Sequence, residues 1–270
     1  MISQADIVAW RQVAPWADDA MVEQDLALSR ALVEIFSDGM LAEGLAIRGG
    51  TALHKLVLLP ATRSSEDIDL VQVQPGPIGS SLDAIRARLN PWLGEPTRDQ
   101  AEASVTLLYR FPSEIPPIRR LRLKIEIHTR EHFSSYGHAL RPLAAASRWF
   151  AGQADIRTFH LDELLATKLR ALFQRRRGRD LFDLWDARER AEVDPARVIA
   201  AFQAYMEAEG RRVTRAQFER DLAAKAQDRA FLGDVQPMLA PGVVYDPLAA
   251  IDMVRAEFVA RLPGVPWRGG

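Results

Sequence analysis

Apolar and polar residues alternate most regularly between residues 121 and 128. Every second residue on one side is Leu or Ile, and the other side carries Arg122, Lys124, Glu126 and His128. A period of two predicts a strand with one face against a core and the other in water. Glu126 then lies on the solvent-exposed face of the strand. Pairing with an arginine would account for a glutamate at this position, and so would metal binding.

A helical period organises two other segments. Residues 18–36 and 161–173 carry apolar residues three and four positions apart, which predicts amphipathic helices. Each apolar stripe contains one charged residue. Asp25 would cap a neighbour or pair with an arginine, or else reach an active site. Lys168 would extend its ammonium group to water, or else aim it at a phosphate or a carboxylate cluster.

The chain changes character near residue 159. Before it, predicted strands at 67–71, 105–111, 121–128 and 156–159 mix with helices, and after it nearly every predicted element is a helix. We therefore predict an α+β fold, with residues 1–158 as one domain and residues 159–270 as a helical second domain. Side chains able to cap helix starts are Ser3, Ser81, Asp180 and Thr214.

A glycine pair lies between the first predicted helices and the first strand. Gly49 and Gly50 follow Arg48, and Thr51 opens a short apolar segment that ends at Pro60. Glycine adopts positive φ and has no Cβ, so the backbone can approach a phosphate, and Thr51 adds a hydroxyl near a helix start. The P-loop and Rossmann patterns are absent. The segment is a candidate phosphate-binding turn, although a plain turn has the same pattern.

Asp67 and Asp69 share one face of the predicted strand at 67–71, because side chains alternate along a strand. Asp is uncommon in strands, and two like charges on one face repel each other. A divalent cation would offset this repulsion, as would a solvated strand edge. Glu126, on another strand, would complete a set of three metal ligands.

A zinc motif is the competing interpretation of the next segment. His128, Glu131 and His132 match the HxxEH pattern of inverted zincins. That pattern requires a helix, whereas His128 ends a predicted strand. A strand end with exposed histidines is the favoured interpretation, and a zinc hydrolase is the alternative.

A basic loop joins two predicted helices of the second domain. It contains Arg175, Arg176, Arg177 and Arg179, and Asp180 and Asp183 follow it. A loop of this composition is either a solvated turn or the rim of an anion-binding site.

Composition and charge exclude several classes of protein. The 270 residues are 48% hydrophobic and carry a net charge of −1, so no global field attracts DNA or a membrane. There is no Cys, which excludes disulfides, thiolate nucleophiles and Cys-ligated zinc. Residues 1–21 lack a signal-peptide pattern, and the longest apolar run, 56–61, is far below the ~20 residues of a membrane helix. A cytoplasmic protein is expected.

Taken in order, these segments resemble the AbiEii/MenT-type toxin nucleotidyltransferases of the DNA polymerase β-like superfamily. The resemblance spans roughly residues 20 to 190. It rests on residues 22–25, the Arg-Gly-Gly-Thr-Ala-Leu of 48–53, the Arg-Ser-Ser-Glu-Asp-Ile-Asp-Leu of 63–70, residues 124–127, residues 161–172 and the Arg-Asp-Leu-Phe-Asp-Leu-Trp of 179–185.

The resemblance implies a small mixed sheet flanked by helices, a helical C-terminal domain and a bilobed molecule. It implies nucleotide transfer from an NTP, with RNA, in particular a tRNA 3′ end, as acceptor and a separately encoded antitoxin as partner. Mg²⁺ or Mn²⁺ would bind Asp67, Asp69 and Glu126. Lys168 and Asp183 would act in catalysis. The nucleotide would contact Arg48, Gly49, Gly50, Thr51, Ser65, Lys168, Arg179 and Asp180.

Two departures from the superfamily pattern affect only the choice of nucleotide. Thr51 stands where many relatives have Ser, and the interval between Gly50 and Asp67 is long. Two further readings share the same motifs: a nucleotidyltransferase that modifies a small molecule of the antibiotic type, and a non-catalytic nucleotide-binding protein. The arginine run favours a polyanionic acceptor.

Overall fold

The structure is a computed structural model and describes residues 2–269. The chain divides into two compact units, Met1–Phe159 and His160–Gly270, and each is described by itself. The sequence analysis placed this boundary after residue 158.

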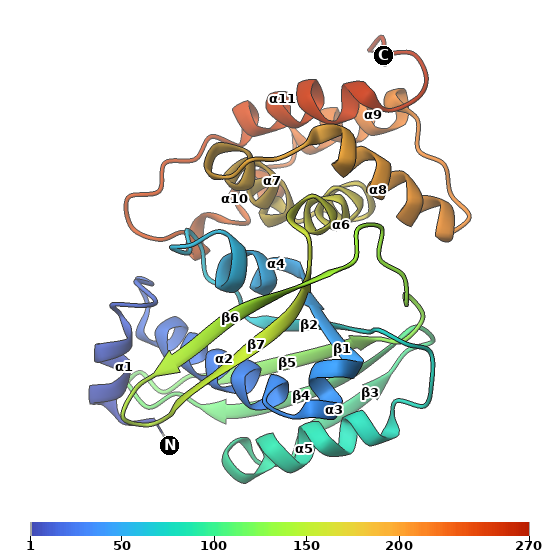
Figure 1. Cartoon of the computed structure of the whole chain (residues 1–270). Coiled ribbons are helices and arrows are strands. Elements are labelled where there is room, and N and C mark those ends of the chain that lie inside the picture. The colour runs from blue at the N-terminus through green and yellow to red at the C-terminus, as the bar shows by residue number, and fades with distance from the viewer. Residues whose placement is uncertain (1, 270) are drawn as a thin grey trace. The chain divides into compact units, whose positions relative to one another are not determined.

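The first unit is built on one mixed sheet, with the strand order β3-β4-β5-β2-β1-β7-β6 in the described residues (Figure 1). Strand β1 pairs in parallel with β7, and β2 pairs in parallel with β5, while the other neighbours are antiparallel. The strands are β1 (Leu45–Arg48), β2 (Asp67–Gln72), β3 (Thr97–Gln100), β4 (Ser104–Pro112), β5 (Arg120–His128), β6 (His138–Ala146) and β7 (Ala151–Phe159).

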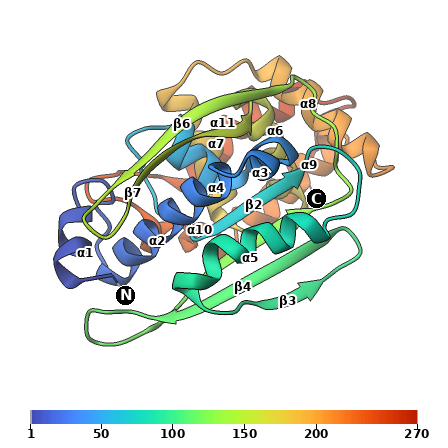
Figure 2. The same cartoon turned by 60° about the horizontal axis from the view of Figure 1, so that its bottom comes forward.

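Helices cover one face of this sheet. Helix α2 contacts β2, β5, β6 and β7, and α5 contacts β4, over which it lies in Figure 2. The helical elements of this unit are α1 (Gln4–Trp10), α2 (Asp19–Phe36), α3 (Gly39–Gly44), α4 (Gly49–Ala52), a π-helical turn η1 (Leu53–Val57) and α5 (Gly79–Leu93).

The alternation along β4 and β5 separates two faces of the sheet. Leu107, Leu123, Ile125 and Ile127 are fully buried on the helix-covered face. The residues between them are half-buried or exposed, so the polar face of these strands carries the charged side chains. We call it the open face, and β2 places Asp67 and Asp69 on it, level with Lys124 and Glu126.

The second unit is helical. Helix α6 packs against α7 and α8, and α11 packs against α7. Its elements are α6 (Leu161–Gln174), α7 (Gly178–Arg190), α8 (Pro195–Ala208), α9 (Arg215–Lys225), α10 (Arg229–Gly233), the 3-10 turn η2 (Gln236–Met238), α11 (Pro247–Glu257) and the 3-10 turn η3 (Val259–Arg261). No helix in residues 2–269 is long and apolar enough to cross a membrane.

Most elements with strong periodicity form as predicted. The helices at 18–36 and 161–173 and the strands at 67–71, 105–111 and 121–128 are confirmed. Ser3 caps α1, and Thr214 caps α9 in a reciprocal capping box with Gln217. The predicted mixed α+β fold with a helical C-terminal part is therefore correct.

Two predicted caps are wrong. Helix α5 begins at Gly79, so Ser81 lies inside its first turn. Helix α7 begins at Gly178, which places Asp180 in the first turn, where its carboxylate forms ion pairs instead of a cap.

The sequence analysis missed strands β3 and β6 and the first half of β7. All four residues of β3 are exposed, and β6 is an edge strand rich in Ala that contains Pro142. Neither strand alternates clearly between apolar and polar residues, and Pro is tolerated only because β6 is at the edge.

Candidate active site

The glycine turn packs directly against a carboxylate of β2. Strand β1 pairs with β2 so that Arg48 lies opposite Asp69, and Gly49 follows with a φ of +81°. A Cβ at Gly49 would lie 2.4 Å from Oδ2 of Asp69. Only glycine satisfies both the positive φ and this close approach, so the turn and the carboxylate are fitted to each other.

A buried arginine lies behind the second glycine. A Cβ at Gly50 would lie 2.3 Å from a guanidinium nitrogen of Arg63, which is only 2% exposed and donates a hydrogen bond of 2.7 Å to the carbonyl of Ser64. The sequence analysis assigned Arg63 no role. Its place just before the Ser-Ser-Glu-Asp segment was the available signal, but nothing in the pattern indicated burial.

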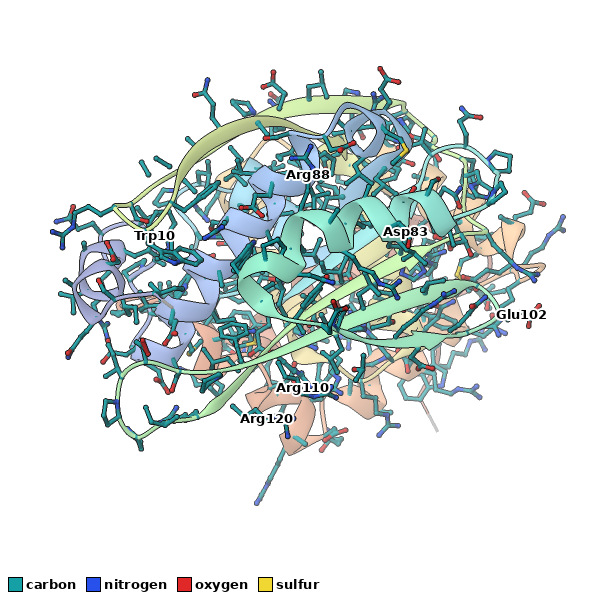
Figure 3. The ribbon with its side chains drawn as sticks, turned by 90° about the horizontal axis from the view of Figure 1, so that it is seen from below. Trp10, Asp83, Arg88, Glu102, Arg110 and Arg120 are labelled. Atoms are coloured by element: carbon teal, nitrogen blue, oxygen red, sulfur yellow. The ribbon has the colours of Figure 1, made fainter. Side chains whose placement is uncertain are left out.

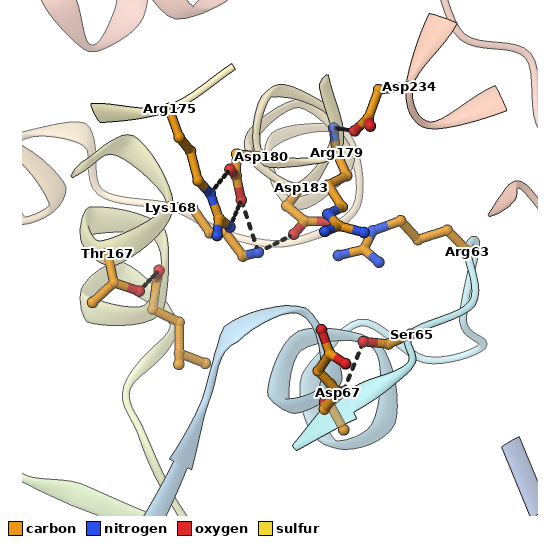
Figure 4. A network of polar contacts seen from close by, with 12 residues as sticks. Arg63, Ser65, Asp67, Thr167, Lys168, Arg175, Arg179, Asp180, Asp183 and Asp234 are labelled. Atoms are coloured by element: carbon orange, nitrogen blue, oxygen red, sulfur yellow. Dashed lines mark hydrogen bonds and ion pairs between the residues drawn. The ribbon is translucent and has the colours of Figure 1, made fainter. Parts of the chain in front are cut away.

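Hydroxyl groups connect the turn to the start of β2. Thr51 Oγ1 lies 2.7 Å from Ser65 Oγ and donates a hydrogen bond of 2.5 Å to the carbonyl of Asp67. Figure 4 shows Ser65 beside Asp67. Both hydroxyls predicted to contact the nucleotide are thus engaged within the protein, where they hold the turn against the strand.

Asp67, Asp69 and Glu126 share the open face, because β2 and β5 pair in parallel with Asp67 level with Lys124 and Asp69 level with Glu126. Glu126 accepts a hydrogen bond of 2.5 Å from Lys124 Nζ and one of 3.1 Å from Ser104 Oγ. No group of three His, Asp or Glu side chains within residues 2–269 is arranged to hold a metal ion. Glu126 is on the predicted face, but its carboxylate is directed at Lys124.

Lys124 is a cation that lies beside these carboxylates. Burial alone would lower the pKa of Lys124, but Glu126, Asp67 and Asp69 raise it above its ordinary value. Burial likewise opposes ionisation of Glu126, yet Lys124 and its other neighbours hold the pKa of Glu126 below its ordinary value. The sequence analysis gave Lys124 no function, although it partly offsets the repulsion between the carboxylates.

The HxxEH segment does not form a zinc site in the described residues. His128 ends strand β5, Glu131 pairs with Arg48, and His132 Nδ1 lies 2.8 Å from the carbonyl of Gln72. The helix that this motif requires is absent from this segment, so the zinc interpretation is wrong. Arg48, predicted to contact the nucleotide, is instead paired with Glu131.

Asp25 proves to be the centre of a buried polar cluster in the first unit. It is 1% exposed and accepts hydrogen bonds from the indoles of Trp10 (2.8 Å) and Trp16 (3.2 Å) and from Lys55 Nζ (2.5 Å). A paired carboxylate was one of the two predicted outcomes, although the partner is a lysine. Lys55 belongs to the π-helical turn that follows the glycine pair, so Asp25 connects α2 to that turn.

The second unit contains a separate cluster of buried charges (Figure 4). Lys168 Nζ on α6 lies 2.7 Å from Asp183 Oδ2 and 3.1 Å from Asp180 Oδ1, both on α7. Arg175 holds Asp180 from its other side, with Nε 2.7 Å from Oδ2. We call these four residues the Lys168 cluster.

Burial decides between the two interpretations of Lys168. The residue is 5% exposed and Asp180 and Asp183 are fully buried, so Lys168 does not extend to water. Burial alone would raise the pKa of Asp180, but Lys168 and Arg175 hold it below its ordinary value. The carboxylate cluster predicted as one target of Lys168 is therefore confirmed, and it consists of Asp180 and Asp183.

The basic loop is largely neutralised by acids of its own unit. Arg175 pairs with Asp180 at 2.7 Å and Arg176 with Asp228 at 3.4 Å, while Arg177 lies 3.8 Å from Asp234. The backbone N–H of Arg179 donates to Asp234 Oδ2 at 3.2 Å. The loop is thus held by α7 and α10 and their flanks, which weakens the case for an anion-binding rim.

The fold is shared with solved structures of nucleotidyltransferases. The toxin MenT4 (Rv2826c) from Mycobacterium tuberculosis matches with a TM-score of 0.64 and 17% identity, covering 98% of this chain and 91% of its own. A putative nucleotidyltransferase from H. pylori matches with a TM-score of 0.58 and 16% identity (89% and 93% covered). JHP933 from Helicobacter pylori matches with a TM-score of 0.55 and 17% identity (90% and 91% covered). No curated protein matches the chain.

The family follows from the sequence itself. The model of the family described as "Nucleotidyl transferase AbiEii toxin, Type IV TA system" matches residues 30–256. The chain belongs to this family, and it is an enzyme of the nucleotidyltransferase class. The segments on which the resemblance rested lie within or directly before the matched range.

Proposed function

We propose that this nucleotidyltransferase toxin transfers a nucleoside monophosphate from an NTP to RNA, with the 3′ end of a tRNA as the acceptor, in a reaction that requires Mg²⁺ or Mn²⁺. The observation that carries the proposal is the close fit between Gly49 and Asp69, with Asp67 on the same face of β2. The predicted phosphate-binding turn and the two predicted metal ligands are therefore adjacent.

The donor set suits a hard divalent cation. Asp67 and Asp69 offer carboxylate oxygens, the ligands that Mg²⁺ prefers, and Glu126 lies level with Asp69 on the same face. When bound, the metal ion would stabilise negative charge on the attacking and leaving oxygens. Glu126 would serve as a third ligand or accept the proton of the attacking hydroxyl, since its lowered pKa keeps it ionised near neutral pH.

The protein's own groups would bind and orient the substrates. The backbone N–H groups that follow Arg48 at the start of α4 would donate to phosphate oxygens. Lys168 would neutralise charge on the phosphates, and Asp180 and Asp183 would fix its ammonium group in position. An acceptor hydroxyl oxygen attacks the α-phosphorus, the bond to the bridging oxygen breaks, and pyrophosphate leaves with the electron pair.

The test combines the four NTPs, each labelled at the α-phosphate, with total RNA and with purified tRNA in the presence of Mg²⁺. We expect label in RNA from the wild type, none after chelation of the metal, and none from Asp69→Asn. Asp99→Asn is a suitable control, because Asp99 is an exposed aspartate on β3. Equal labelling by wild type and Asp69→Asn would contradict the metal assignment.

The acceptor is tested in the same experiment. Labelled tRNA cut at its 3′ terminus should lose the label, because transfer to that end leaves it on the terminal nucleotide. Label in a small-molecule fraction and none in RNA would instead support the antibiotic-type reaction. Because the family is a type IV toxin–antitoxin family, a separately encoded antitoxin is the expected partner, and its gene should relieve toxicity when co-expressed.

A further inference from the structure

The open face of the first unit carries a row of basic side chains that leads away from Asp67 and Asp69. Lys124 lies level with Asp67, Arg122 and Arg120 continue along β5, and Arg110 lies on β4 directly opposite Arg122. Figure 3 shows Arg110 and Arg120 on this pair of strands. We call Arg110, Arg120, Arg122 and Lys124 the basic stripe.

The basic stripe lowers the stability of the folded state. Arg110 and Arg122 are directly opposite in an antiparallel pair, where like charges repel each other. Arg110 donates a hydrogen bond of 2.9 Å to Thr97, and Arg122 lies 3.8 Å from Glu66 on the exposed surface. The ion pair with Glu66 is exposed and contributes little, and Thr97 carries no charge, so folding stability does not account for this arrangement.

Several other arginines of the first unit are compensated. Ion pairs join Arg88 to Asp38 at 3.0 Å and Arg30 to Glu34 at 2.8 Å, and Arg119 pairs with Asp18. Within residues 2–269, Arg110 and Arg120 form no ion pair, and both are exposed. The charges of Arg110 and Arg120 are therefore available to a partner from outside the chain, while Arg122 contacts Glu66 and Lys124 contacts Glu126.

We propose that the basic stripe binds the sugar–phosphate backbone of the RNA acceptor and directs its reactive end to the face that carries Asp67 and Asp69. The proposal rests on the RNA acceptor proposed above and adds the surface that holds it. Alternate residues of β5 are ~6.6 Å apart, so Arg120, Arg122 and Lys124 form an evenly spaced row of donors. Guanidinium groups match phosphate oxygens in geometry as well as in charge.

The same face lacks what a protein partner would need. Strands β3, β4 and β5 place no Trp, Tyr or Phe on it, because Tyr109 and Phe111 alternate to the helix-covered side. Aromatic anchors dominate the energetics of protein interfaces, whereas backbone recognition of a nucleic acid needs mainly positive charge. The chemistry of the stripe therefore favours a phosphodiester chain over an acidic protein.

The test compares two triple variants of the full chain. Arg110→Gln/Arg120→Gln/Arg122→Gln removes three charges from the stripe and leaves Lys124, which contacts Glu126, in place. Arg98→Gln/Arg141→Gln/Arg212→Gln removes the same charge from exposed sites elsewhere. Binding of fluorescent tRNA is measured by anisotropy over about 50 to 200 mM salt, the range in which phosphate contacts weaken steeply.

We expect the stripe variant to bind tRNA about 10- to 100-fold more weakly at low salt, with the slope of log K against log salt reduced by about two to three. The control variant should keep most of the affinity and slope. NTP binding, measured by calorimetry, should be equal in all three proteins, and the stripe variant should raise KM for RNA more than it lowers kcat.

Three other outcomes would each overturn the inference, and each shows which part of it fails. If the wild type labels RNA and the stripe variant binds it normally, the stripe is not the RNA surface, while the proposed function stands. If the wild type transfers nucleotide but binds no RNA, the RNA acceptor and the stripe both fail. If the stripe variant loses an acidic protein partner and keeps RNA binding, a protein occupies this face.

Discussion

The two charged clusters of this protein are built on opposite principles. On the open face of the first unit, three carboxylates (Asp67, Asp69 and Glu126) share one ammonium group, that of Lys124, and all are partly accessible. In the Lys168 cluster, two carboxylates face two cations, and the carboxylates are fully buried. The first arrangement is open to an external cation, whereas in the second the carboxylates are buried against Lys168 and Arg175.

This difference predicts where a substitution affects catalysis and where it affects folding. The carboxylates of the first cluster are partly accessible, so replacement of one of them should affect the chemistry more than the fold. A buried charge that is balanced by its neighbours leaves those neighbours uncompensated when it is removed. Substitutions in the first cluster should therefore lower activity with little effect on stability, whereas substitutions in the Lys168 cluster should lower stability as well.

The largest expected effect is the loss of activity in Asp69→Asn. Nucleotide transfer should fall by about 10³-fold or more, because a ligand for charge stabilisation in the transition state is lost. The melting temperature should stay the same or rise slightly, because a repulsive charge is removed. Label transfer and thermal unfolding of the same preparation check both statements, and a strongly lowered melting temperature would contradict the contrast between the clusters.

Lys168→Met should lower the free energy of unfolding by about 3–5 kcal/mol, because it removes the ammonium group that the buried carboxylates of Asp180 and Asp183 share. Adding Asp183→Asn should restore part of that stability without restoring activity. Chemical denaturation of the wild type, the single variant and the double variant measures this coupling. Normal stability of Lys168→Met would show that the cluster is not held together by this ion pair.

Gly49→Ala should destabilise the first unit by about 1–3 kcal/mol and reduce activity, because the new Cβ would require positive φ and displace the Asp69 carboxylate. Gly44→Ala is the matched control, since a Cβ there meets nothing within 4 Å. Unfolding curves and label transfer for both variants provide the comparison. Equal behaviour of the two would rule out a special role for the turn.

The Lys168 cluster should also make the second unit sensitive to acid. The folded pKa of Asp180 is below its ordinary value, so the stability it contributes is fully present above about pH 4 and is lost as the pH falls through the folded pKa. Asp180→Asn should be less stable at neutral pH and should lose less stability between neutral and acid pH. Denaturation midpoints at a series of pH values test this, and parallel profiles for the two proteins would exclude Asp180 as the cause.

The smallest effect is expected at the basic stripe. Arg122→Thr should raise the free energy of unfolding by about 0.2–1 kcal/mol, because it removes the repulsion with Arg110 and its exposed contact with Glu66 contributes little. Arg98→Thr on β3, which faces no opposing charge in the ladder, should show no such gain. A loss of stability in Arg122→Thr would mean that the stripe serves the fold.

The local pattern of apolar and polar residues determined much of the secondary structure of this protein. The period-two alternation at 121–128 fixed β5 and its open face, and the helical period fixed α2 and α6, because each pattern has one way to bury its apolar side. The same logic placed Asp67 and Asp69 on a common face. Spacing also identified Lys168 and Asp25 as charges within apolar stripes.

Only the tertiary structure decided what those charges contact. Asp25 accepts hydrogen bonds from Lys55 and two indoles, and Glu126 accepts one from Lys124. The guanidinium of Arg63 lies 2.3 Å from where a Cβ at Gly50 would be. The spacing of residues along the chain predicts none of these contacts. Strands β3 and β6 form because neighbouring strands supply their hydrogen bonds, not because of their own residues. Sequence thus specifies which side chains share a face, while packing between distant segments specifies which charges are balanced and which remain available for chemistry.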